Sequence, residues 1–115
     1  MVEHGIGDAP LDRTFAALAD PTRRALLDAL RGGDRTVGEL AAPFPTSLAA
    51  VSKHLRVLER AGLVAREVRG REHRLKLRAT PLRHAAAFAD SYRAFWEARL
   101  EALEAYVDSP GDEAG

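Results

Sequence analysis

Three cations lie at helical spacing between Ser47 and Gly62, and they are the side chains of this sequence best suited to bind an anion. Lys53, Arg56 and Arg60 recur at steps of three and four residues, so at about 100° per residue they share one face of a helix. Such a helix fits the major groove of DNA, where its amino-terminal half reaches base edges and later cations meet phosphates. The DNA contacts predicted for this helix are Ser47, Ala49, Ser52, Lys53, His54, Arg56 and Arg60.

A basic helical face is more often a solvated surface than a binding site, so this prediction depends on the neighbouring elements. A helix-turn-helix pattern precedes the segment and a basic hairpin follows it, and together they favour DNA binding. His54 is ambiguous, because it lies about 80° from the centre of the apolar face. Packing at the helix boundary is favoured over a DNA contact for this residue.

The opposite face of the helix is apolar, which predicts how the chain holds it. Ser47 can accept hydrogen bonds from the free amides of the first turn, and Gly62 can adopt the left-handed conformation that ends a helix. The side chains expected to face a core are Leu48, Val51, Leu55 and Leu58.

Three shorter helices are predicted before it, at residues 11–18, 21–32 and 36–42. Asp20 and Pro21 suit the start of the second helix, and Thr36 and Glu39 have the spacing of a capping box at the start of the third. Pro43 and Pro45 break that helix, so residues 36–61 form a helix, a turn and a helix. Further phosphate contacts are predicted at Arg23, Arg24 and Thr36, with a purely structural role as the alternative for each.

Two short runs, 63–68 and 73–78, follow the basic helix and predict a hairpin. In the second run Leu75 and Leu77 alternate with cations, which is the pattern of a half-buried strand. The hairpin residues predicted to touch phosphates or the minor groove are Arg69, Gly70, Arg71 and Arg74, and a merely soluble tip is the alternative.

The last predicted helix runs from Thr80-Pro81 to Val107, which is longer than a chain of 115 residues needs for one domain. We therefore expect its aromatic face to bind a second copy of the chain, although a core position or a small effector pocket is possible for the same residues. The expected dimer interface comprises Leu11, Phe15, Phe88, Tyr92, Phe95, Trp96, Leu100 and Leu103.

Charge is uneven along the chain, although its formal net charge is zero. Residues 35–78 carry ten basic and four acidic side chains, net +6, between flanks of net −2 and −4. The expected organisation is one domain over residues 11–107, with a flexible arm at 1–10 and a flexible acidic tail at 108–115. No apolar run approaches the roughly 18 residues of a membrane span and no signal peptide begins the sequence, so we expect a cytoplasmic protein that does not bind membranes.

Neither catalysis nor a cofactor is predicted. The absence of cysteine excludes disulfides, thiolate metal sites and thiol redox chemistry. The sequence has no glycine-rich phosphate loop, and its four histidines are scattered.

Several of these segments resemble the ArsR-type family of bacterial winged-helix transcriptional regulators. The resemblance covers about residues 11–107 and rests on LADPTRR at 18–24, VGELA at 37–41, VSKHLRVL at 51–58 and AGLV at 61–64. It implies a mainly α-helical winged helix-turn-helix fold with a small β-hairpin and a long carboxy-terminal dimerisation helix. It also implies a dimeric repressor that binds double-stranded DNA at an inverted repeat.

The sequence departs from those members of the family that sense metals. The third helix has no cysteine, and the last helix offers only His84, Asp90, Glu97 and Glu101 without a paired histidine, so no metal site is predicted. The alternatives are a metal-gated or ligand-gated regulator of the same fold, whose inducer is unknown, and a winged-helix protein-interaction module that does not bind DNA.

Overall fold

The computed structural model describes residues 9–108 of the chain, which divides into two compact units, one ending at Ala85 and the other beginning at Ala86. The mainly helical fold with a small antiparallel sheet agrees with the predicted class. The elements in order are α1 (Ala9–Leu18), α2 (Pro21–Ala29), the 3-10 turn η2 (Leu30–Gly32), β1 (Arg35–Thr36), α3 (Val37–Ala41), α4 (Leu48–Arg60), β2 (Val64–Arg69), β3 (Glu72–Leu77), α5 (Thr80–Asp90) and α6 (Arg93–Asp108).

The predicted flexible ends lie mostly outside the described residues. Helix α1 begins at Ala9, two residues before the predicted start at Leu11, so Ala9 and Pro10 belong to a helix and not to the arm. Helix α6 ends at Asp108, which was assigned to the tail.

Side chains begin α2, α4 and, as described below, α3 in the way the sequence predicts. The Asp20 carboxylate accepts a hydrogen bond from the Arg23 amide at 3.1 Å, and Pro21 occupies the first turn of α2. The Ser47 hydroxyl accepts from the Ala50 amide at 3.1 Å at the start of α4. These bonds satisfy amides that have no partner inside the helix, which stabilises each start.

The sheet has the order β1-β3-β2, with both pairs antiparallel. Strands β2 and β3 pair from Val64 opposite Leu77 to Arg69 opposite Glu72, so the turn contains only Gly70 and Arg71. Gly70 has a φ of 62°, which a residue without a Cβ adopts readily. Strand β1 was not predicted, because two residues are too few to show an alternating pattern.

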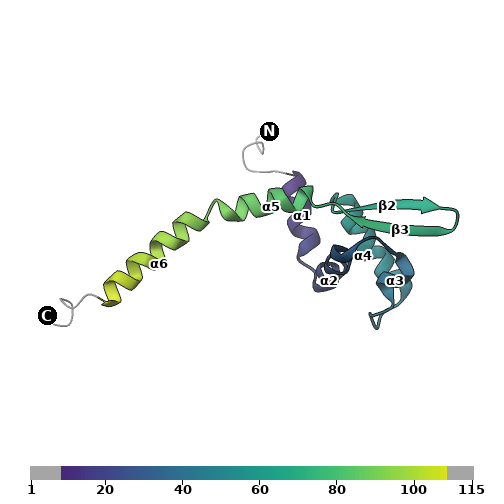
Figure 1. The fold of residues 1–115 in the computed structure, drawn as a ribbon, viewed down its shortest axis with the longest axis horizontal. Helices are drawn as coiled ribbons and strands as arrows, with labels where there is room; N and C mark the ends of the chain where they lie inside the picture. The colour runs from purple at the N-terminus through teal and green to yellow at the C-terminus, as the bar shows by residue number, and fades with distance from the viewer. Residues whose placement is uncertain (1–8, 109–115) are drawn as a thin grey trace. The chain divides into compact units, whose positions relative to one another are not determined.

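The core of the first unit holds α4 by its inner face, where Val51, Leu55 and Leu58 are fully buried. Leu48 does not join them, since 56% of its surface is exposed, and its predicted core position is wrong. Its Cα lies about 50° around the helix from the centre of the other three, in the first turn of α4. In Figure 1, α2, α3 and α4 gather near the base of the β2–β3 hairpin, whose tip projects beyond the helices.

The long last helix is interrupted at Ser91 and Tyr92, which separate α5 from α6. The Ser91 hydroxyl donates to the Phe88 carbonyl at 2.6 Å, and the Tyr92 amide reaches back three residues to the Ala89 carbonyl at 3.1 Å. A serine hydroxyl that bonds to a carbonyl of the preceding turn competes with the regular backbone hydrogen bonds of an α-helix. The backbone bond over three residues makes this turn tighter than an α-helical turn. The predicted single helix is therefore two consecutive helices.

Candidate nucleic-acid interface

The outer face of α4 carries the predicted cations in an unpaired state. Lys53, Arg56 and Arg60 are exposed, and within residues 9–108 no carboxylate lies within ion-pairing distance of any of them. Because the inner face of the same helix is buried, α4 is held rigidly while these charges remain in solvent. Of the other predicted contacts on this helix, Ser47 and Ala49 are exposed and Ser52 is half-buried.

The β2–β3 hairpin is tied to α4 by a contact that the sequence did not predict. Arg66 of β2 donates from Nε to Oε2 of Glu59 at 2.9 Å, and its Nη1 lies 3.0 Å from Nδ1 of His73 on β3. The signal was present in the sequence, because Arg66 shares its strand face with the buried Val64 and so points toward the core side. The β2–β3 hairpin, which forms the wing, is thereby fixed to the last turn of α4.

The arginines of the hairpin differ in their partners. Arg69 pairs with Glu67 at 3.1 Å and Arg74 pairs with Glu72 at 3.5 Å, and in both pairs the acid lies two residues away on the same strand. Arg71 is exposed at the turn beside Gly70, and no ion pair involves it in the described part of the chain. Of the three arginines predicted to touch DNA in the hairpin, Arg71 is therefore the one most readily offered to a phosphate.

A groove brings together predicted contacts from three elements. Thr36 at the start of α3, Ser52 of α4 and Arg71 of the hairpin all line it, together with Gly38 and His73. Thr36 also lies opposite Arg74 in the pairing of β1 with β3. The start of α3, the middle of α4 and the β2–β3 hairpin thus flank one groove.

A capping box satisfies two amides at the amino end of α3. The Thr36 amide donates to Glu39 Oε1 at 2.8 Å, and the Glu39 amide donates to Thr36 Oγ1 at 3.1 Å. The hydrogen bond from the Thr36 amide is the main cause of a lowered pKa of Glu39. The structure thus shows Thr36 as a helix cap, and a phosphate contact at the start of α3 stays a prediction.

Arg23 and Arg24 also have structural roles, which is the alternative that the sequence left open. Arg23 donates from Nε to the Ala17 carbonyl at 2.7 Å, and Arg24 donates from Nη1 to the Leu18 carbonyl at 2.7 Å, so both cap the end of α1. Nη1 of Arg23 also lies 3.2 Å from Nδ1 of His54. We leave Arg23 out of the DNA surface, because all its guanidinium nitrogens have partners in the chain.

His54 links α4 to the start of α2. Its Nδ1 lies 3.8 Å from Oδ2 of Asp20, and its side chain is 28% exposed. The pKa of Asp20 is lowered, chiefly by the hydrogen bond from the Arg23 amide and further by the charge of the Arg23 guanidinium. This arrangement supports the packing role that was favoured for His54.

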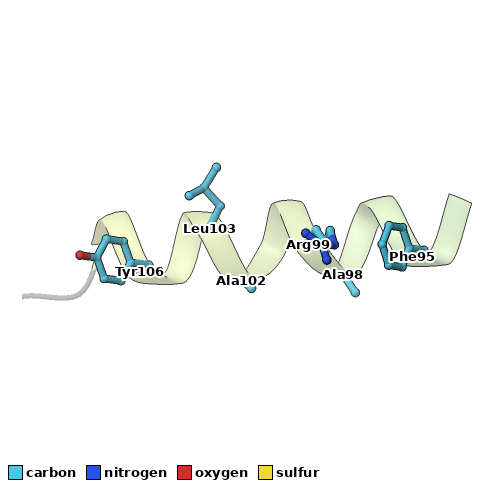
Figure 2. A pocket seen from close by; sticks show the side chains of 6 residues that line it. All are labelled: Phe95, Ala98, Arg99, Ala102, Leu103 and Tyr106. Atoms are coloured by element: carbon cyan, nitrogen blue, oxygen red, sulfur yellow. The ribbon is translucent and has the colours of Figure 1, made fainter. Parts of the chain in front are cut away.

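In the second unit, α6 presents a broad apolar face and has no buried residue. A shallow hollow on it is lined by Phe95, Ala98, Arg99, Ala102, Leu103 and Tyr106, all from this one helix (Figure 2). The Arg99 guanidinium lies 4.6 Å from the centre of the Phe95 ring. Of the residues predicted for the dimer interface, one is half-buried, Leu11, and the others are exposed: Phe15, Phe88, Tyr92, Phe95, Trp96, Leu100 and Leu103.

Residues 9–108 contain neither a metal-binding cluster nor a membrane-spanning helix. No group of three or more His, Cys, Asp or Glu side chains there is placed to hold a metal ion. Nor is any helix in that range both long enough and apolar enough to cross a membrane.

Helix α4 follows a turn, buries its inner face and exposes a basic outer face, and the β2–β3 hairpin is fixed beside it. This arrangement defines a winged helix-turn-helix DNA-binding protein. The family model described as a helix-turn-helix domain matches residues 18–67. The chain is similar to the HTH-type transcriptional regulator Rv2034 of Mycobacterium tuberculosis, with 41% identity over 89% of this chain and 92% of the relative. It is also similar to the transcriptional repressor SdpR of Bacillus subtilis, with 40% identity over 52% of this chain and 67% of the relative.

Solved structures agree with this assignment. The ArsR family transcriptional regulator RHA00566 is 38% identical and superposes with a TM-score of 0.72 over 76% of this chain and 97% of the other. An ArsR-like transcriptional regulator from Rhodococcus sp. RHA1 is 36% identical, with a TM-score of 0.66 over 88% and 95% of the two chains. The chain belongs to the ArsR family of helix-turn-helix transcriptional regulators, and it is a DNA-binding regulator.

Proposed function

We propose that this chain is a homodimeric repressor that binds a short inverted repeat in double-stranded DNA. Its half-sites lie about one helical turn apart, so that two copies of α4 enter successive major grooves on one side of the duplex. The observation that carries the proposal is the row of unpaired cations, Lys53, Arg56 and Arg60, on the outer face of a helix whose inner face is buried. The similarity to a relative named as a transcriptional repressor supports the sign of regulation.

The contacts divide between bases and phosphates. Ser47, Ala49, Ser52 and Lys53 lie in the amino-terminal half of α4 and approach base edges, whereas Arg56 and Arg60 meet the backbone. In the wing, Arg71 beside Gly70 contacts a phosphate or the minor groove, and Arg69 and Arg74 exchange their carboxylate partners for phosphates.

The second copy is held through the apolar face of α6. This helix exposes Phe95, Trp96, Leu100 and Leu103, and a helix without any buried side chain gains little stability from its own chain. Packing against its equivalent in a second copy covers the same patch on both partners, as in a two-fold dimer. Residues 11–107 then act as one DNA-binding and dimerisation domain, in the cytoplasm, where the DNA is.

A gel shift with DNA from upstream of the protein's own gene tests the proposal. Wild type should retard this DNA, and Lys53→Glu should not, because it places a negative charge against the duplex. Static light scattering of the same sample should give the mass of a dimer. A monomer that binds no DNA would instead support a protein-interaction module.

A further inference from the structure

The first turn of α4 carries an apolar side chain in a position where a core residue was expected. Leu48 is the first residue of α4 and is 56% exposed, whereas Val51, Leu55 and Leu58 on the same helix are fully buried. Its neighbour Ala49 is exposed as well. The amino end of the helix therefore presents a small apolar surface, and the basic side chains begin only at Lys53.

The residue that precedes this surface, Ser47, caps its own helix. The Ser47 hydroxyl accepts from the Ala50 amide at 3.1 Å, as a cap does. Besides this hydroxyl, the first turn of α4 presents the isobutyl group of Leu48 and the methyl group of Ala49. The free energy gained when they are covered depends on the apolar area that the partner supplies.

DNA displays one apolar group in the major groove, the 5-methyl group of thymine. Contact with a leucine side chain removes apolar surface of both partners from water, and a cytosine, which has a hydrogen at this position, offers less. The unpaired cations of the same helix supply the attraction that brings the two surfaces together.

We propose that Leu48 is a specificity-determining residue that contacts a thymine 5-methyl group in each half-site of the operator. The inference rests on the proposed function, because it requires α4 to enter the major groove. It adds a preference for thymine at one defined position, selected by methyl contact and not by hydrogen bonds.

The test removes one methyl group at a time. A duplex is selected by the wild-type protein from a random-sequence library, and each thymine in turn is replaced by deoxyuridine, which keeps the same hydrogen-bonding edge. Binding is measured by fluorescence anisotropy. One thymine in each half-site should show a loss of about fourfold in wild type, the effect of one buried methyl group.

The variant Leu48→Ala identifies the protein partner of that methyl group. It should bind the thymine and deoxyuridine duplexes with less than about a twofold difference. If the leucine side chain touches the thymine methyl group, removing the methyl group costs little affinity once the side chain is gone. Lys53→Gln is the matched control, since it should weaken binding to both duplexes while keeping the fourfold ratio. Leu48 is exposed, so the alanine variant should fold, and its circular dichroism spectrum checks this.

Two kinds of result overturn the inference, and they are distinguishable. If wild type binds but no deoxyuridine weakens it, or if Leu48→Ala keeps the full penalty, Leu48 does not contact a methyl group and DNA binding by α4 still stands. If wild type selects no duplex at all, the proposed function fails and the inference fails with it.

Discussion

Arg66 on β2 donates from Nε to Oε2 of Glu59, in the last turn of α4, over 2.9 Å. Both side chains are only about a quarter exposed, at 22% and 27%. The pair is shielded better than Arg69 with Glu67, whose side chains are 70% and 57% exposed. The position of the wing relative to the DNA-binding helix therefore depends on this one contact more than on the other ion pairs of the hairpin.

Removing the charge of Glu59 should destabilise the fold and weaken DNA binding together. We expect Glu59→Gln to lower the free energy of unfolding by about 1 kcal/mol, because a partly buried guanidinium loses its charged partner. Urea unfolding measures this loss. The matched control is Glu67→Gln, which should change the value by less than about 0.5 kcal/mol because its pair is exposed. Equal effects of the two variants would show that the Glu59 contact does not hold the wing.

The capping box at the start of α3 should make stability depend on acidity. The hydrogen bond from the Thr36 amide lowers the pKa of Glu39 below its usual value, so the folded state binds a proton less readily than the unfolded chain does. The stabilising effect of this carboxylate is complete above the unfolded pKa near 4.5 and disappears as pH falls through the lower folded pKa.

Glu39→Gln isolates this contribution, because the amide oxygen can still accept from Thr36 but does not titrate. Wild type should lose its advantage over the variant as pH falls below about 4.5. Urea unfolding at a series of pH values measures the difference. Asp20 also has a lowered pKa, but it is present in both proteins and cancels. A wild-type advantage that persists unchanged into strong acid would contradict the role given to Glu39.

The apolar face of α6 should be required for association. Leu103→Glu places a charge among Phe95, Ala102 and Tyr106 on the hollowed face, so we expect a monomer at concentrations at which wild type is a dimer. Sedimentation velocity measures the change. Glu104→Gln is the control, because Glu104 lies about 100° further around the helix, on the side that also carries Glu97 and Glu101. Dimers of both variants would exclude this face from the interface.

The parts of the fold that depend on neighbours in the sequence were predictable. Asp20, Thr36 and Ser47 begin their helices as expected, because a cap bonds to an amide only three residues away. Pairings between distant residues, such as Arg35 with Leu75 in β1 and β3, have no such local pattern. Leu48 was misplaced because helical spacing gives the direction of a side chain but not where the core ends.

The candidate site was predictable to a similar extent. The shared helix face of Lys53, Arg56 and Arg60 followed from spacing alone, whereas their lack of ion-pair partners within the described part of the chain was visible only in the structure. The partners of Arg23 did not, because the carbonyls that it binds lie at the end of a different helix and become close only in the folded chain. DNA contact by the other predicted residues of α4 and the hairpin stays a prediction.

The affinity of Lys53→Glu for DNA tests the central claim most directly. Fluorescence anisotropy with a duplex selected by the wild-type protein, repeated over a series of salt concentrations, gives both the dissociation constant and its salt dependence. For wild type the logarithm of the binding constant should fall linearly with the logarithm of the salt concentration, because bound cations release counterions. At low salt Lys53→Glu should bind at least about tenfold more weakly, and the difference should narrow as salt screens the reversed charge. Equal binding by the variant and wild type would contradict the placement of α4 in the major groove.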